Sequence, residues 1–360
     1  MKGEHPKAWW KEVKRLSGMQ SRSCDLLSKL DVVEIQDRTA EEIANTINRA
    51  FLEPREEYRS SPLTPLPLED CPKFLEVTEE RTYKLLSRLN PAKARGPDGL
   101  PNWLLREFAS LVAFPVKTIL NASFSEQRLP SSWKYADVTP FPKKTPVQNL
   151  KKDLRPISLT PCLSKVAEDI VVTDHLKPAV MKVLDSNQYG AVPKPSTSIA
   201  LLSVIHEWIT GTDGNGSVVR AIIFNYRKAF DLIDLIYILG KLNLPICVIN
   251  WIIDFLSNRF QRIKMAKGCL SEWGSVPSGV LQGTKLGPWL FVAMINDLTI
   301  NGACVWKFVD NTTASEVVGK GEVSSAQIIA DKVVEWSLAN RVQLNSEKCK
   351  ELQISFARNN

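Results

Sequence analysis

Residues 218–231 read VVRAIIFNYRKAFD, and together with KFVDNTT at residues 307–313 they decide the fold class. The first stretch is an apolar run, interrupted only by Arg220 and ended by the polar Asn225, which is typical of a buried strand. The second stretch predicts a strand, a turn and another strand, with Asp310 at the turn. Two such strand ends lying side by side can face a ligand, and oxygen ligands there suit Mg²⁺. Taken alone, an aspartate in a hairpin turn is more often a turn former.

The rest of the chain predicts a mixture of helices and strands. Helical periodicity predicts helices at residues 40–53, 78–89, 102–127 (kinked or broken at Pro115), 160–176 and 326–340. Strands are expected at residues 259–266 and at residues 135–144, where two prolines suit an edge strand. The proline-rich residues 61–72 are typical of a linker. This order predicts an α+β fold with antiparallel elements.

The composition is that of a globular protein, because 44% of the 360 residues are hydrophobic and 24% are charged. No apolar run approaches the roughly 20 residues that span a bilayer, and the first residues have no apolar core of a secretory signal. The seven cysteines are scattered and form no CxxC pair, so they indicate reduced thiols in an intracellular protein. Nucleus and cytoplasm are both left open.

The net charge of +7 is concentrated in one segment. Residues 128–165 hold two acidic and eight basic side chains, the basic ones being Arg128, Lys134, Lys143, Lys144, Lys151, Lys152, Arg155 and Lys165. Such an excess fits a strand that faces the phosphate groups of a nucleic acid. A loop that only keeps the protein soluble is the alternative.

A glycine-rich segment lies between the two deciding stretches. Residues 276–298 read VPSGVLQGTKLGPWLFVAMINDL, with Gly279, Gly283 and Gly287 four residues apart and an apolar helix after them. Glycines allow a backbone to approach a ligand closely. An ordinary glycine-rich turn before a helix is the simpler alternative.

In this order, the three segments resemble the palm motifs of reverse transcriptases, and in detail those of non-LTR retrotransposons. NYRKAFD resembles the DYRKAFD pattern, SGVLQGTKLGPWLF resembles the PQGT–LGP block, and FVDN stands where the family has YADD. Five upstream or downstream blocks are also similar: LNPAKARGPDGLP (89–101), LPSSWKYADVTPFPKK (129–144), DLRPISL (153–159), SNQYGAVPKPSTS (186–198) and WSLANRVQLNSEKCK (336–350). The resemblance covers residues 75 to about 357.

This resemblance implies a right-hand polymerase with fingers and palm, the palm being an antiparallel sheet backed by helices. We expect a basic helical N-terminal region and a linker at residues 1–74, fingers with part of the palm at residues 75–212, and palm with the following helix and strand at residues 213–360. No thumb is expected after residue 360. The implied activity is RNA-directed DNA polymerisation with two Mg²⁺ ions, and the implied partners are an RNA template, a DNA primer and dNTPs, with no membrane. Protein partners are not addressed.

The resemblance also assigns roles around the metal ions. Asp310 matches the first aspartate of the YADD box, which binds metal. Asn225 stands where the family has its other metal-binding aspartate, and Asn311 stands at the second aspartate of the box. Lys348 matches the lysine proposed to assist the leaving pyrophosphate, although a solvated surface charge is the alternative.

Five further positions match residues that contact nucleotide or template. Lys143 and Arg155 match basic residues of the fingers that contact the triphosphate, where a guanidinium can bind phosphate oxygens bidentately. For both, a solvated surface charge is the alternative. Phe230 matches an aromatic residue that screens the sugar 2′ position, with a core phenylalanine as the alternative. Gln282 and Gly283 stand where the family shapes the nucleotide and template site.

The departures from the family fall at its chemistry. Asparagine offers Mg²⁺ a carbonyl oxygen without a charge, so Asn225 and Asn311 predict an impaired enzyme. Rescue by Asp231 or Asp234 is not expected. Leu281 replaces a motif proline, and residues 191–192 replace a Phe-Arg pair. Two alternatives stay open, which are a non-enzymatic RNA- or DNA-binding remnant and a marginally folded product without function.

Overall fold

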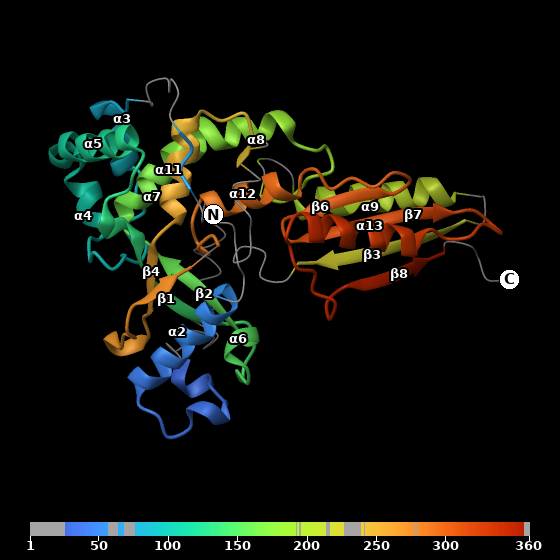
Figure 1. Cartoon of the computed structure of the whole chain (residues 1–360), viewed down its shortest axis with the longest axis horizontal. Helices are drawn as coiled ribbons and strands as arrows, with labels where there is room; N and C mark the ends of the chain where they lie inside the picture. The colour runs from blue at the N-terminus through green and yellow to red at the C-terminus, as the bar shows by residue number, and fades with distance from the viewer. Residues whose placement is uncertain are drawn as a thin grey trace, which may run out of the picture.

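The structure, a computed structural model, describes residues 26–56, 64–67, 76–191, 193, 196–213, 217–226, 239–240, 242–277 and 279–355. Phe230, Asp231 and Asp234 lie outside these residues, as does most of the proline-rich stretch. The described part folds around two four-stranded sheets with helices between and around them (Figure 1). The predicted α+β class is therefore confirmed.

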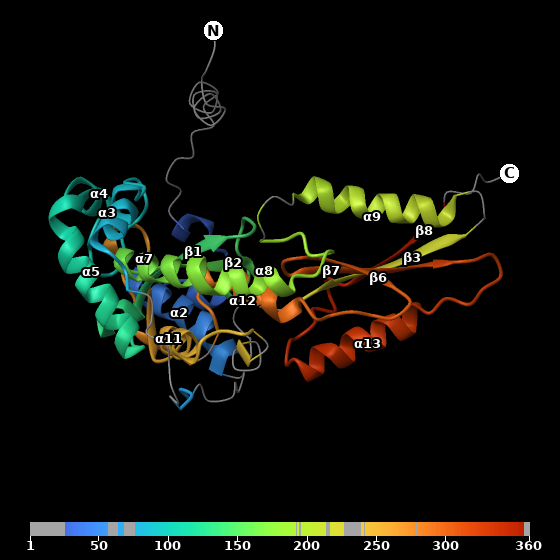
Figure 2. The ribbon, with the colours of Figure 1, turned by 90° about the horizontal axis from the view of Figure 1, so that it is seen from above.

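One sheet, here called the palm sheet, has the strand order β6-β7-β3-β8 and is antiparallel throughout. Its strands are β3 (Val218–Asn225), β6 (Cys304–Phe308), β7 (Asn311–Val318) and β8 (Lys350–Ile354). Helix α9 (Thr197–Thr212) covers one face and α13 (Ala326–Ala339) covers the other, as Figure 2 shows from above. Every residue of β3 is buried or half-buried, because both faces of the strand are covered by a helix.

The other sheet, here called the fingers sheet, has the order β2-β1-β4-β5. Its strands are β1 (Tyr135–Pro142), β2 (Leu154–Leu159), β4 (Arg259–Ile263) and β5 (Gly274–Val276). Strand β1 pairs with β2 on one side and with β4 on the other, so the expectation of an edge strand at residues 135–144 is wrong. Its prolines are tolerated because pairing with β4 stops at Val138, before Pro140 and Pro142.

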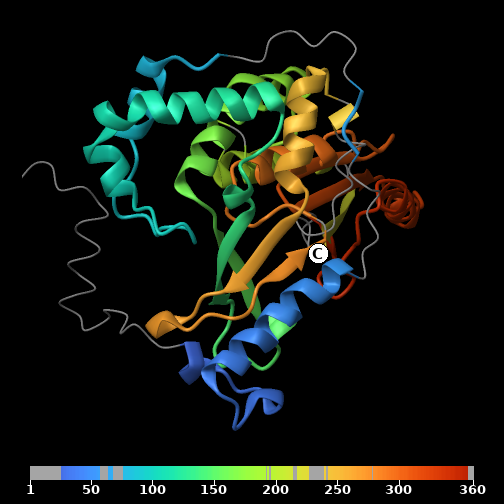
Figure 3. The same ribbon diagram turned by 60° about the vertical axis from the view of Figure 1, so that its left-hand side comes forward.

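Helix α2 (Ala40–Glu56) packs along one face of the fingers sheet (Figure 3). Its apolar stripe of Ile43, Ile47 and Phe51 shares a buried cluster with Val138 of β1 and Ile263 of β4. Residues 26–56 therefore share a core with the fingers strands, and the domain boundaries remain a prediction.

A larger apolar core joins the remaining helices. These are α3 (Glu79–Ser87), α4 (Asn102–Glu107), α5 (Ala109–Glu126), α7 (Cys162–Val171), α8 (Lys177–Val183), α11 (Ile246–Leu256) and α12 (Leu286–Ile295), with the short α6 (Leu150–Asp153) at the tip of the fingers sheet. A π-helical turn, Val172–Leu176, joins α7 to α8. Short 3₁₀ turns lie at Leu26–Lys29, Val33–Ile35, Ser131–Lys134 and Ala266–Gly268. Helices α8 and α12 lie between the two sheets (Figure 1).

The predicted helix at residues 102–127 is interrupted at Phe108, and Pro115 lies within α5. Of the two expected outcomes at Pro115, a break is therefore wrong, and a kink stays untested. A proline there removes the hydrogen bond to the carbonyl of Leu111. Leu111 is 72% exposed, so water can satisfy that carbonyl. In the described part of the chain, no helix combines the length and the apolar character that a membrane crossing requires.

Candidate functional site

The ends of β3 and β7 bring Asn225 and Asn311 face to face. The two residues are directly opposite in the antiparallel register, so their side chains lie on the same side of the sheet. The Nδ2 of Asn225 donates a hydrogen bond to the Oδ1 of Asn311 at 3.2 Å. Each amide thus satisfies part of the hydrogen-bonding capacity of the other.

Asp310 lies beside this amide pair, in the two-residue turn between β6 and β7. Its backbone carbonyl accepts a hydrogen bond from the N–H of Tyr226, the residue after Asn225, at 3.4 Å. Val309, the other turn residue, has a φ of 52°, which is strained for a β-branched residue. The structure therefore brings Asn225, Asp310 and Asn311 together at one end of the palm sheet.

The residues at these strand ends do not fit a pair of Mg²⁺ ions. Among the described residues there, Asp310 supplies a single carboxylate, and the Asn311 oxygen already accepts the hydrogen bond from Asn225. Across the described ranges, no cluster of three or more His, Cys, Asp or Glu side chains could hold a metal ion. Two divalent ions bring four positive charges, which neutral amides cannot balance.

Lys348 lies in a turn that contacts the amide pair. The turn begins at Asn345, whose N–H donates to the carbonyl of Asn225 at 2.8 Å. The N–H of Lys348 closes the turn by bonding to the carbonyl of Asn345 at 2.9 Å, and its side chain is exposed. Lys348 thus lies near this end of the palm sheet, and the role that the resemblance implies for it stays a prediction.

Gln282 and Gly283 lie against strand β2 of the fingers sheet. The carbonyl of Gln282 accepts a hydrogen bond from the N–H of Ser158 on β2 at 2.9 Å. Gly283 has a φ of +107°, and a β-carbon there would lie 3.1 Å from the Ser158 carbonyl oxygen. Both the left-handed conformation and this close approach favour glycine.

Lys143 and Arg155 lie on the fingers sheet, and both are exposed. Arg155 is on β2, directly opposite Phe141 of β1. The Nζ of Lys143 donates to the carbonyl of Lys152 at 2.8 Å, so in this structure the ammonium bonds to its own hairpin. Lys152 in turn forms an ion pair with Glu347 of the palm turn at 3.3 Å, which brings the fingers tip close to Lys348.

Comparison with known proteins identifies the family of this chain. Residues 141–356 match the family described as Reverse transcriptase (RNA-dependent DNA polymerase). The chain belongs to the reverse transcriptase family. It is 26% identical over 321 residues to the RNA-directed DNA polymerase from mobile element jockey of Drosophila melanogaster, covering 84% of this chain and 34% of that protein.

Two other relatives agree with this. The probable RNA-directed DNA polymerase from transposon X-element of Drosophila melanogaster is 24% identical over 331 residues, which is 88% of this chain and 34% of the relative. The jockey enzyme of Drosophila funebris is 24% identical over 298 residues, which is 78% of this chain and 32% of the relative. The chain thus spans about a third of the length of these relatives. The predicted reverse transcriptase domain of the non-LTR retrotransposon type is confirmed.

In this chain a glycine whose contact sequence reasoning missed supports the Asp310 turn. Gly190 lies in a segment that pairs with β6, where the N–H of Tyr189 bonds to the carbonyl of Lys307 at 2.9 Å. A β-carbon on Gly190 would lie 2.2 Å from the backbone nitrogen of Val309. The SNQYG motif contains this glycine, but its contact with the Asp310 turn is visible only in three dimensions.

A buried ion pair next to the same turn was also missed. Lys307 is fully buried, and its Nζ donates to Asp185 at 2.6 Å and to the carbonyl of Asn296 at 2.7 Å. Burial lowers the pKa of the Lys307 ammonium, and the Asp185 carboxylate opposes that shift. A single lysine in the apolar strand CVWKF does not indicate a partner elsewhere in the chain, so the sequence gives no signal for this pair.

Proposed function

We propose that this chain is a reverse transcriptase domain in which nucleotide transfer to a primer 3′-hydroxyl is strongly impaired. One observation carries the proposal, which is the hydrogen-bonded amide pair of Asn225 and Asn311 beside Asp310. The family uses divalent metal ions for this reaction. A site with two neutral amides lacks most of the charge that would hold those ions.

The expected size of the defect follows from electrostatics. Removing one preorganised group that stabilises transition-state charge costs on the order of 10²–10³ in rate. Losing the charge of a metal ligand should cost at least as much, because the occupancy of the ion falls as well. Since the two positions serve one site, we do not expect their effects to add simply.

Primer extension on an RNA template tests the proposal. We compare the chain as it exists with N225D/N311D and with D310N, in Mg²⁺ and in Mn²⁺. The chain should incorporate no more dNTP than D310N, because both lack a competent metal site. Robust incorporation by the unaltered chain, lost in D310N, would contradict the proposal. Activity gained in N225D/N311D would show that the two amides are the main defect.

A second function, binding of an RNA or DNA strand without catalysis, is favoured by the open face of the fingers sheet. This face lies opposite α2 and carries stacked aromatic rings, with Tyr135 and Phe260 at 5.2 Å and the Tyr135–Trp273 edge contact at 4.9 Å. The Arg262 guanidinium lies 4.4 Å above the Trp273 ring. Aromatic surfaces flanked by cations bind single strands through stacking and phosphate contacts.

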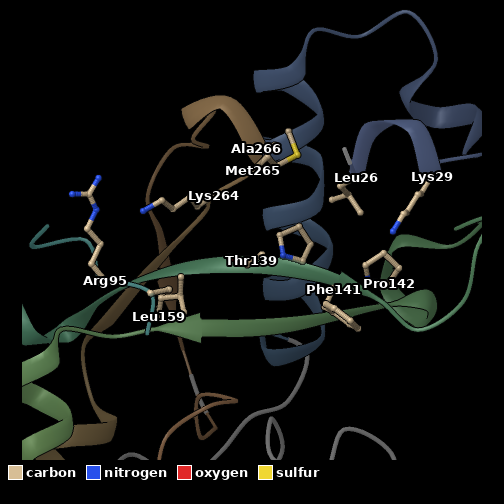
Figure 4. Close-up of a pocket in the computed structure, with 12 residues that line it drawn as sticks. Leu26, Lys29, Arg95, Thr139, Phe141, Pro142, Leu159, Lys264, Met265 and Ala266 are labelled. Carbon is tan, nitrogen blue, oxygen red and sulfur yellow. The ribbon is translucent and has the colours of Figure 1, made fainter. Parts of the chain in front are cut away.

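A hollow of about 480 Å³ lies next to β1, and its lining includes Thr139 and Phe141 of this face. Figure 4 shows Phe141 and Thr139 of β1 with Arg95 and Lys264 at one end of the hollow and Lys29 at the other. Lys264 also pairs with the buried Asp137 at 3.0 Å. The combination of an apolar floor and cationic ends suits a base with its phosphate.

Salt-dependent binding separates this function from a non-binding remnant. Affinity for single-stranded RNA should fall as salt rises, and R95A/R155A should flatten that slope by about one to two units per log unit of salt, since two phosphate contacts are lost. K332A, on the exposed side of α13, is the control and should leave the slope unchanged. An RNA affinity with the same salt dependence in R95A/R155A and in the unaltered chain would contradict this proposal.

A further inference from the structure

Glu168 contacts the glycine-rich loop from within the core. The residue lies on α7 and is only 1% exposed. Its Oε1 accepts a hydrogen bond from the N–H of Leu286, the first residue of α12, at 2.8 Å. The carboxylate also receives a backbone hydrogen bond from Lys285. A fully buried carboxylate is costly, so it requires compensation of this kind.

The start of α12 needs such a partner. The first four N–H groups of a helix have no partner within the helix, and they carry the positive end of its dipole. Lys285 is the N-cap residue, and its side chain makes no capping bond. The Lys285 ammonium instead forms an ion pair with Asp169, the residue after Glu168. Two consecutive acidic residues of α7, Glu168 and Asp169, therefore bind the N-terminal end of α12.

The other end of the loop is held by the same piece of chain. Ser158 of β2 donates to the carbonyl of Gln282, and Gly283 packs against the Ser158 carbonyl. Strand β2 and helix α7 are separated only by residues 160–161. Residues 154–171 thus contact both ends of the loop that runs from Gln282 to Leu286. The same segment contains Arg155.

We propose that Glu168 is a positioning residue, which fixes Gln282 and Gly283 against β2 by holding the first turn of α12. It does not contact a substrate itself. The consequence for nucleic-acid binding rests on the proposed function, whereas the positioning of the loop does not.

The charge state of Glu168 supplies a readout that a purely structural side chain would lack. Burial raises the pKa of the Glu168 carboxyl to about 7, against the hydrogen bonds from the Leu286 and Lys285 N–H groups. The cationic groups that face it are the Arg259 guanidinium and the Lys285 ammonium. Above neutral pH the ionised carboxylate holds the helix dipole, and below it this ion–dipole attraction is lost.

Hydrogen exchange of the folded chain tests the positioning. Protection factors of the amides at residues 284–287, corrected for intrinsic rates, are compared between pH 6 and pH 8. Relative to those of α11, which follow the global stability, they should rise several-fold with pH in the unaltered chain, because the ionised carboxylate attracts the helix dipole. E168Q, which retains the acceptor oxygen without the charge, should remove the pH dependence. E168A should lower protection at residues 284–287 by about tenfold, corresponding to one lost hydrogen bond.

Two results would overturn the proposal. One is equal protection of residues 284–287 in E168Q, E168A and the unaltered chain. The other is a loss of amide protection in E168A that is as large in α11 as at residues 284–287, because this would indicate global destabilisation. D174N is the matched control, since Asp174 follows α7 but pairs with Arg81, away from the loop.

A measurement of nucleic-acid affinity distinguishes a failure of this inference from a failure of the proposed binding function. Affinity for an RNA–DNA hybrid is measured by fluorescence anisotropy with the same variants. If the unaltered chain binds the hybrid, E168A should weaken binding several-fold and D174N should not, and equal binding by E168A would contradict the link to the site. If the unaltered chain binds no hybrid, the second proposed function, nucleic-acid binding, is contradicted, and hydrogen exchange alone decides the role of Glu168.

Discussion

Gly190 lies against the backbone of Val309, so closely that a β-carbon on the glycine would be 2.2 Å from the Val309 nitrogen. Val309 and Asp310 form the turn of the β6–β7 hairpin, so this contact supports the backbone of the turn that carries Asp310. The segment that ends in Gly190 is itself paired with β6 through Tyr189 and Lys307. The turn is thus supported by a backbone contact that no larger residue allows.

Gly190→Ala should therefore destabilise the protein. A methyl group that meets backbone forces the hairpin or its support to shift, and such overpacking costs about 1–3 kcal/mol. Urea unfolding of the variant measures this cost. Gly240→Ala is the matched control, because a β-carbon there meets nothing within 4 Å. An equal unfolding free energy for both variants would show that Gly190 gives no such support.

Asp185→Asn should lower the free energy of unfolding, because the buried Lys307 ammonium loses its counter-charge. The substitution retains an oxygen that can accept from Asn187 but leaves the ammonium without its counter-charge. Breaking a buried pair in this way costs about 3–5 kcal/mol, whereas an apolar replacement of both partners is often tolerated. We expect the double variant K307M/D185N to recover most of the lost unfolding free energy. A double variant as unstable as Asp185→Asn would contradict this account.

The sequence predicts the strand ends well because their signals are local. The apolar run before Asn225 and the turn at Asp310 each predict a strand end without knowledge of the rest of the chain. That the ends meet follows only from the family resemblance or from the register of β3 and β7. In the structure Lys348 lies in the turn that bonds to Asn225, whereas Gln282 and Gly283 lie against Ser158 of β2. The roles that the motifs imply for these three residues remain predictions.

Features that depend on tertiary contacts could not be predicted. Glu168 follows the helical period of an ordinary surface acid, and its burial depends on the approach of α12. The strand around Lys307 does not indicate its partner, because Asp185 is 122 positions away. The break at Phe108 arises in a continuous helical pattern, where Pro115 gives the stronger but misleading local signal.

The stability of the chain should depend on the protonation of Glu168. Its pKa is raised from 4.5 to about 7 on folding, so the folded state binds the proton more tightly than the unfolded state. The resulting stabilisation is fully present below pH 4.5 and is lost as the pH rises through 7. At 1.36 kcal/mol per pKa unit, the difference amounts to about 3 kcal/mol.

Urea unfolding between pH 5 and pH 8 measures this effect as a difference between two proteins. The unfolding free energy of Glu168→Gln, relative to that of the unaltered chain, should increase over this range. Other titrating groups cancel in the comparison, because both proteins contain them. A constant difference across the range would show that Glu168 keeps an ordinary pKa.

The side-chain amides of Asn225 and Asn311 join the ends of β3 and β7 by a hydrogen bond that needs no metal ion. In N225D/N311D, two like charges would lie directly opposite each other beside Asp310, which destabilises a strand pair. A bound divalent ion would relieve that repulsion and stabilise the folded state by mass action.

Thermal unfolding with EDTA or with millimolar Mg²⁺ tests this claim most directly. We predict that Mg²⁺ leaves the Tm of the unaltered chain unchanged, while N225D/N311D melts lower in EDTA and regains its Tm in Mg²⁺. D310N/N225D/N311D controls for ions bound elsewhere and should regain less. A rise in the Tm of the unaltered chain with Mg²⁺ that is abolished by D310N would contradict the claim.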